Sequence, residues 1–200
     1  MKAEREFSDE LEAWLRSEEP KTIGGLEKVF GEKTFAVAIM LLMFVPALPA
    51  PTGGITHVFE VITMLIAAQM VLGRRTPWIP QRWRERELGA LTTGKALPFV
   101  IRRIRWFERF SRPRLSFLFD NSMFLRILGV IIIAFTLGAF VAPPFSGLDT
   151  LPALGVVTIA LSIMLEDVVV LAIGVFIGLG GIVLIVTIGR ALADFFRNLL

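Results

Sequence analysis

Stretches without a charged residue alternate with highly charged stretches along this chain. The uncharged stretches are residues 34–59, 61–73, 127–148, 150–165 and 168–189. Several of them reach the roughly 20 residues that a helix needs to cross the hydrocarbon core of a bilayer. The pattern predicts an all-α, polytopic integral membrane protein. It divides the 200 residues into five segments: 1–33, 34–73, 74–126, 127–167 and 168–200.

The segment 34–73 is interrupted in its middle by a cluster of helix-breaking residues. Proline removes a backbone donor and blocks a continuous helix, and glycine favours a turn. The sequence therefore predicts a helical hairpin with arms at about 35–45 and 55–72. The first arm would be only about 16 to 20 Å long at a rise of about 1.5 Å per residue, so a spanning hairpin and a re-entrant one both stay open. The residues that shape the tip are Pro46, Pro49, Pro51, Gly53 and Gly54.

A similar pattern returns in the segment 127–167. Each segment has an apolar arm, then Phe-Val and a proline cluster (FVPALPAP and FVAPPFSG), a glycine and a second apolar arm, and the second tip contains Pro143 and Pro144. We interpret the two hairpins as an internal repeat. Each copy begins beside a basic residue, Lys33 or Arg126, which favours parallel repeats if both hairpins are complete. A single crossing per copy would make the repeats inverted. The stretch 168–189 predicts a final transmembrane helix.

The charged residues are distributed unevenly. The segment 1–33 holds six basic and nine acidic residues, whereas 74–126 holds 13 basic and four acidic residues, a net charge of +9. Short segments rich in lysine and arginine stay on the cytoplasmic side of a membrane. We therefore expect 74–126 and the N-terminal segment, which shows no cleavable signal, to be cytoplasmic in a bacterial inner membrane.

Two amphipathic helices are predicted at the membrane interface. The first lies in 1–33, after a possible cap at Ser8, and ends before Pro20; it would pack its apolar stripe on the membrane domain or lie in the interface, or else dock a partner. The second lies at 98–110, where arginines interleave with aromatic and aliphatic residues. Because flanking spans hold it against a membrane, we expect it to contact anionic lipid headgroups and not nucleic acid. The stripe of the first helix is Phe7, Leu11, Trp14 and Leu15.

Glu60 is the sharpest functional candidate, because a charge at the bilayer centre costs roughly 2.5–3.5 kcal/mol. His57 lies three residues before it, and Thr56 and Thr63 lie four before and three after, so all four can share one helix face. Burial favours the neutral forms of a carboxyl and an imidazole, which makes a proton-linked pair feasible. Alternatively, Glu60 has no function and either lies near the outer surface or is neutral and hydrogen-bonded to threonine. Gln69, on the same arm, is a helix-packing residue or a weaker ligand candidate.

Three acidic residues are secondary candidates. Glu166 and Asp167 read as a tight turn at the cytoplasmic surface, and Asp149, beside the second proline cluster, would face the opposite surface or line a cavity. Only proximity to Glu60 would place any of them on a proton or cation path. The chain has no cysteine and a single histidine, so we expect no metal and no cofactor.

Three strings, PALPAPTGG, QMVLGRRTPWIP and LPALGVVTIALSIMLED, resemble the ExoD family of bacterial exopolysaccharide synthesis proteins. The resemblance covers about residues 22–189, and its most specific piece is the string at 69–80. It implies a protein integral to the bacterial inner membrane that is associated with making or exporting exopolysaccharide.

Three classes of function follow. The first is transport or handling of a lipid-linked anion such as polyprenyl phosphate, with Arg74 and Arg75 on the headgroup phosphate and Glu60 and His57 binding or exchanging a proton. The second, an enzyme, is not expected, because 74–125 has no paired aspartates in a loop, no histidine and no phosphate-binding glycine loop; a membrane-embedded enzyme acting on lipid phosphate stays open. The third is a non-catalytic scaffold or regulator of polysaccharide machinery that uses residues 74–126, which we call the basic segment. Membrane lipids are the expected partners, and a homo-oligomer stays open.

Overall fold

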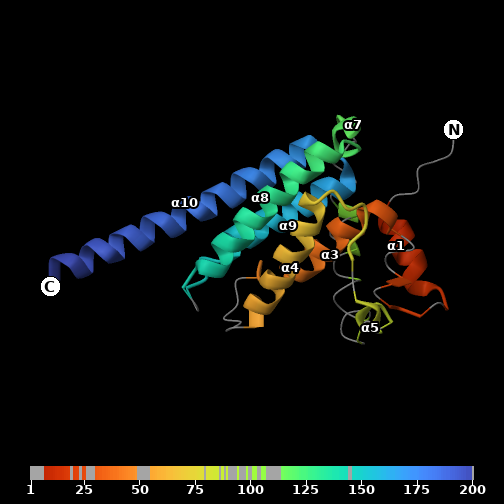
Figure 1. Ribbon diagram of the computed structural model, residues 1–200, viewed down its shortest axis with the longest axis horizontal. Helices are drawn as coiled ribbons and strands as arrows, with labels where there is room; N and C mark the ends of the chain where they lie inside the picture. Colours follow the sequence, from red (N-terminus) through yellow and green to blue (C-terminus); the bar gives the residue numbers. More distant parts are fainter. Residues whose placement is uncertain are drawn as a thin grey trace.

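The computed structural model is helical throughout the part of the chain that it describes (Figure 1). The described residues are 7–18, 20–22, 24–25, 30–48, 55–78, 80–85, 87, 89, 94, 98, 101–102, 105–106, 114–143 and 146–199. They form no strand, and their extended pairing is limited to isolated bridges between Thr22 and Glu87 and between Arg114 and Asp167. The all-α prediction is confirmed for these residues.

The helices follow the predicted apolar arms closely. The first hairpin has arms of 11 and 17 residues, and the second has arms of 20 and 16 residues. In chain order the elements are α1 (Phe7–Arg16), the 3-10 turn η1 (Gly31–Lys33), α3 (Thr34–Phe44), α4 (Ile55–Val71), α5 (Gln81–Arg84), α7 (Ser116–Phe119), α8 (Ser122–Val141), α9 (Thr150–Leu165) and α10 (Val168–Leu199).

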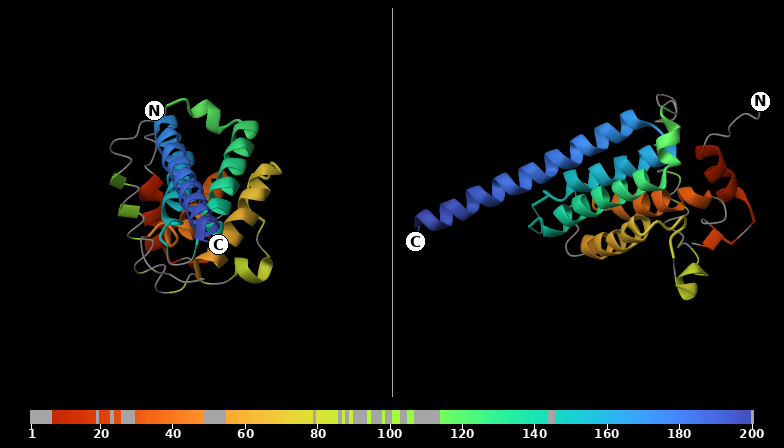
Figure 2. Two further views of the ribbon diagram at one scale, coloured as in Figure 1. Left: turned by 90° about the vertical axis from the view of Figure 1, so that its left-hand side faces the viewer. Right: turned by 45° about the horizontal axis from the view of Figure 1, so that its top comes forward.

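The two hairpins pack so that each arm of one meets the opposite arm of the other. Helix α3 packs against α9, and α4 packs against α8, while the two arms within each hairpin also touch. The two hairpins therefore make equivalent contacts, because the first arm of each packs on the second arm of the other. Figure 2 shows the four helices side by side, with α10 against the second hairpin and continuing beyond them toward the C-terminus.

The second arms of the hairpins end in the same way. Helix α4 is followed by Gly73, whose φ of 81° is left-handed, and the amides of Gly73 and Arg74 bond back to the carbonyls of Met70 and Gln69. Helix α9 is followed at once by Glu166, whose φ of 53° is also left-handed. A left-handed conformation costs roughly 1–2 kcal/mol in a residue other than glycine. Contacts with the surrounding structure must therefore stabilise Glu166 in this conformation.

A cation from the entrance of each hairpin lies at the end of the other hairpin. Lys33, just before α3, has its Nζ 2.8 Å from Glu166 Oε1 and 3.2 Å from the carbonyl oxygen of Met164, at the end of α9. Arg126, in the first turns of α8, has its guanidinium against Gly73, at the end of α4. Cations are favourable at helix C-termini because the last carbonyls point outward there. These two contacts join the hairpins at one end of the bundle, which we call the basic end.

Glycines let α9 and α10 approach closely. A Cβ on Gly155 of α9 would lie 2.6 Å from the Cα of Gly178, and a Cβ on Gly174 of α10 would lie 2.9 Å from the backbone nitrogen of Ile159. Backbone lies on both sides of this contact, so no side chain can rotate away to make room. Small residues at such crossings allow dispersion contacts between helix backbones.

Two helices are long and apolar enough to cross a membrane. They are α8, with 20 residues, and the part of α10 from Val168 to Ala191, and the most apolar windows of these helices are only 33% and 28% buried within the protein. Their outward faces carry large apolar side chains, among them Val130, Leu137, Phe176 and Val183. An apolar surface of this extent marks a contact with lipid or with another protein. Helices α3, α4 and α9 are shorter, and α4 also exposes large apolar side chains, among them Val58 and Leu65.

Replacing Gly155 by alanine should destabilise the α9–α10 crossing, because its new methyl group meets backbone. We expect the free energy of unfolding in detergent to fall by about 1–3 kcal/mol, as for other overpacked sites. The matched control is Gly180→Ala on α10, where a Cβ meets nothing within 4 Å, so the control should gain the helix propensity of alanine. Thermal unfolding of both variants measures the difference, and a Gly155→Ala protein as stable as the control would contradict this packing.

Candidate functional site

The basic end of the bundle encloses a cavity of about 380 Å³. It lies where both hairpins begin and end, so the start of α3, the end of α4, the α7–α8 turn and the end of α9 all contribute to its wall. Its charged and polar lining residues are Lys33, Arg74, Arg75, Asp120, Ser122 and Glu166, and its apolar ones include Phe35, Met70, Phe119, Leu125 and Ile163.

The turn after α4 brings the two arginines to this cavity. The left-handed Gly73 reverses the chain, so that Arg74 and Arg75 follow at once. Gln69 fixes the segment that follows the arginines by two hydrogen bonds to the backbone of Trp78. Its Oε1 accepts from the Trp78 amide at 2.5 Å, and its Nε2 donates to the Trp78 carbonyl oxygen at 3.3 Å. Gln69 therefore positions the arginine turn from one side of the cavity.

The other charges of the cavity are partly engaged with each other. Lys33 pairs with Glu166, as described above, and Asp167 does not reach the cavity because its Oδ1 caps α10 by accepting from the Val169 amide at 2.8 Å. The start of α8 adds backbone donors, and the Asn121 side chain caps it by accepting from the Met123 amide. Helix N-termini favour anions.

A second polar group lies near the opposite end of α4. Glu60 is completely buried, and its Oε2 lies 2.8 Å from Nδ1 of His57, which is about one third exposed. The His57 ring lies tilted against the ring of Phe140, in the last turn of α8, with 4.9 Å between the ring centroids. Asp149, just before α9, acts on Glu60 electrostatically. This group therefore joins α4 with both ends of the second hairpin tip.

The predicted site residues thus divide between two places. Arg74, Arg75 and Glu166 meet at the basic-end cavity, and Gln69 supports them. Glu60, His57 and Asp149 are grouped elsewhere, about 20 Å from Arg74 along α4 at a rise of about 1.5 Å per residue. At the tips, Pro46 is buried and Pro143 is exposed; Pro49, Pro51, Gly53, Gly54 and Pro144 lie outside the described residues.

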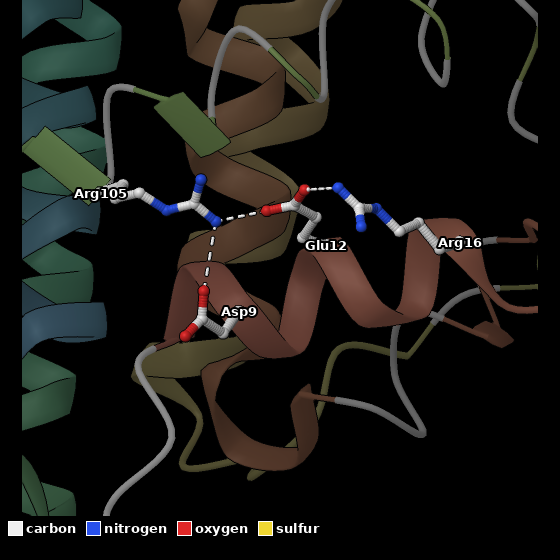
Figure 3. Close-up of polar contacts among 4 residues, drawn as sticks. All are labelled: Asp9, Glu12, Arg16 and Arg105. Atoms are coloured by element: carbon white, nitrogen blue, oxygen red, sulfur yellow. Dashed lines mark hydrogen bonds and ion pairs between the residues drawn. The ribbon is translucent and has the colours of Figure 1, made fainter.

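Figure 3 shows a cluster of charged side chains that the sequence analysis did not identify. Arg105, from the basic segment, contacts Asp9 at 3.2 Å and also Glu12 on α1, and Glu12 contacts Arg16 on its other side. Leu11 is buried on the same helix, so α1 packs its apolar stripe and pairs its acidic face. The opposite net charges of 1–33 and 74–126 were the signal for this pairing.

The basic segment is thereby joined to the N-terminal helix. Of the predicted helix at 98–110, residues 98, 101–102 and 105–106 are described and helical, and the rest lie outside the described residues. Arg105 and then Arg16 hold the pKa of the Glu12 carboxyl below its usual value. A cavity of about 450 Å³ lies beside this contact, between α1 and the basic segment. Part of the positive charge of the segment is therefore engaged inside the protein.

None of the residues that the structure describes form a cluster of three or more histidine and acidic side chains able to hold a metal ion. The described chemistry is a basic cavity with adjacent oxygens, and a buried carboxylate hydrogen-bonded to a histidine. Neither arrangement contains a nucleophile held by a general base.

Fold and site together describe a helical protein with two helices long and apolar enough to cross a membrane and a cavity lined by basic residues at one end of its bundle. The family model "Exopolysaccharide synthesis, ExoD" matches residues 7–187, so the chain belongs to the ExoD family. It is 30% identical to the protein ExoD of Rhizobium meliloti over 185 residues, covering 87% of this chain and 73% of that one. It is 25% identical over 167 residues to an uncharacterised protein, slr1875, of Synechocystis, covering 80% and 76%. No solved structure matches the chain.

Docking of α1 should weaken in acid, because the folded state lowers the pKa of Glu12. A carboxyl whose pKa is lowered by folding stabilises the folded state at pH values above its usual pKa of 4.5. This stabilisation is lost as the pH falls through the pKa of the folded state. We expect the emission of Trp14, with the other tryptophans replaced by phenylalanine, to shift to longer wavelength across that range. The control is Glu12→Gln, whose shift should be smaller; equal shifts in both proteins would contradict the role of Glu12.

Proposed function

We propose that this ExoD family protein binds the phosphate headgroup of a polyprenyl-linked intermediate during exopolysaccharide synthesis or export. The observation that carries the proposal is the cavity of about 380 Å³ at the basic end, which is lined by Arg74, Arg75 and Lys33. Membership of the ExoD family supplies the involvement in exopolysaccharide synthesis.

The donors around the cavity suit a phosphate. Guanidinium groups bind phosphate oxygens with two parallel hydrogen bonds, and each hydrogen bond to a charged group contributes roughly 1.5–3 kcal/mol. The N-terminus of α8 adds a favourable dipole beside Ser122. Asp120 and Ser122 provide oxygens that accept hydrogen bonds from hydroxyl groups, such as those of a sugar attached to the phosphate.

The position of the cavity also suits a lipid headgroup. It lies at the ends of α8 and α9, beside helices with apolar outward faces, so a polyprenyl chain can lie along α8 while its phosphate enters between the arginines. Phe35, Met70 and Leu125 line the inner part of the cavity. A soluble anion would gain nothing from these apolar surfaces.

The orientation follows from the charges. We propose that the protein lies in the bacterial inner membrane with the basic end in the cytoplasm, since 74–126 carries a net charge of +9. We propose that the second hairpin then crosses fully, because its first arm, α8, has 20 residues and is long and apolar enough to span a bilayer.

The alternative role is that of a scaffold which recruits polysaccharide machinery through the basic segment. Its exposed Arg102 and Trp106, outside the cavity, are the observation in its favour. A scaffold would need these residues and not the cavity. The two roles are therefore separable by substitution.

Replacing Arg74 and Arg75 together by glutamine should weaken binding of polyprenyl phosphate to the purified protein at least tenfold, because two charge-assisted contacts are lost. Native mass spectrometry in detergent measures the Kd, and exopolysaccharide yield in cells should fall in parallel. The matched control is the pair Arg82→Gln and Arg102→Gln, which removes the same charge outside the cavity. Equal weakening by both pairs would contradict a specific site, and a yield that depends on the control pair alone would support the scaffold.

The proposed topology predicts the accessibility of introduced cysteines, since the chain has none of its own. In spheroplasts, Ser146→Cys at the exposed hairpin tip should react with a membrane-impermeant maleimide. Glu85→Cys, in the basic segment, should react only after permeabilisation. Protection of Ser146→Cys from the impermeant reagent, together with reaction with a small permeant one, would instead indicate a re-entrant hairpin.

A further inference from the structure

The headgroup cavity leaves Glu60 without a role, although this carboxyl is the most unusual group in the bundle. Its side chain has no exposed surface, and its two oxygens differ. Oε2 lies 2.8 Å from Nδ1 of His57, whereas Oε1 has no hydrogen-bond partner among the described residues. A buried carboxylate with an unsatisfied oxygen is costly unless it is neutralised by a proton or a cation.

The surroundings of Glu60 on α4 are polar but closed to solvent. Thr56 and Thr63 lie four residues before and three after it, so they share its helix face, and both are buried. Within the described part of the chain, the hydroxyl of Thr63 has no partner either. A hydroxyl can donate a hydrogen bond, so a hydroxyl on the same face is a suitable partner for Oε1 when the proton is on Oε2.

His57 connects this buried carboxyl to the exterior. Its side chain is 34% exposed, whereas that of Glu60 is 0% exposed. It lies in the first turn of α4 and against Phe140 in the last turn of α8, which is the end of the bundle with the hairpin tips. An imidazole has two ring nitrogens, so it can hold Glu60 through Nδ1 and present Nε2 to another group.

Few other charges act on the pair. The helices packed against α4 are α3, which contains no ionisable residue, and α8, whose only one is Arg126 at the opposite end. Asp149, from the turn before α9, adds a negative charge. No cation on these neighbouring helices is therefore placed to neutralise Glu60 permanently.

We propose that Glu60 and His57 form a proton-exchange site that opens to the face of the protein opposite the basic end. A proton taken up at His57 Nε2 makes the ring cationic, and the ring then gives its Nδ1 proton to Glu60 Oε2. This leaves a neutral carboxylic acid and a neutral imidazole that carries its hydrogen on Nε2. Release follows the same steps in reverse, so one proton is gained or lost and no other reactant is needed. This site is independent of the headgroup proposal and can fail or stand without it.

Infrared difference spectroscopy of the purified protein in detergent tests the site directly. Between pH 9 and pH 5 we expect the stretching band of a protonated carboxyl group to appear, with the small isotope shift of an exchangeable proton in deuterium oxide. The Glu60→Gln variant should lose this band. The absence of any band that depends on Glu60 across this range would overturn the proposal.

Two further variants keep Glu60 in place and test the effects of its neighbours Asp149 and His57 separately. Asp149→Asn should move the midpoint of the band to lower pH without removing it, because a negative charge that favours protonation is lost. His57→Gln should keep the band but slow its appearance at least tenfold after a rapid drop in pH. An unchanged rate would overturn the role of His57, and a band that responds to sodium at constant pH would overturn the proton site in favour of a cation site.

Discussion

The bundle depends on two reciprocal contacts, in which each hairpin places one basic side chain at the end of the other hairpin. Lys33, at the entrance of the first hairpin, holds the carbonyl of Met164 and the left-handed Glu166 at the end of the second. Arg126, at the entrance of the second, lies against Gly73 at the end of the first. Each contact places a positive charge at a helix C-terminus, where it is favourable. The two contacts bring the four helix ends together, and the cavity exists because they meet there.

This arrangement separates two kinds of chemistry along α4. At the basic end, the turn after α4 presents two arginines near the proposed depth of lipid headgroups, and Gln69 holds that turn through the Trp78 backbone. Near the other end, the same helix carries a buried carboxyl whose contact with the exterior is His57. A rigid helix of 17 residues joins the two places. The headgroup and proton proposals therefore concern opposite ends of one helix, although neither requires the other.

The surface of the protein is divided in a corresponding way. Helices α8 and α10 expose apolar side chains along most of their length, which suits lipid, and glycines at the α9–α10 crossing let their backbones pack without large side chains. In the N-terminal part of the protein, in contrast, the acidic face of α1 engages Arg105. The net charge of the basic segment overstates the charge that it can offer to a membrane, because part of it is paired within the chain.

The sequence by itself determined the elements: uncharged stretches and proline clusters predicted the helix arms to within a few residues, since helix breaking and apolar length are local properties. It also identified Glu60 and His57 as a pair, because residues three apart share a helix face. It did not predict that Arg74 and Arg75 would line one cavity with Glu166, nor that Arg105 would pair with Glu12. Those contacts join residues distant in the chain, and only the packing of the two hairpins against each other and of α1 against the basic segment decided them.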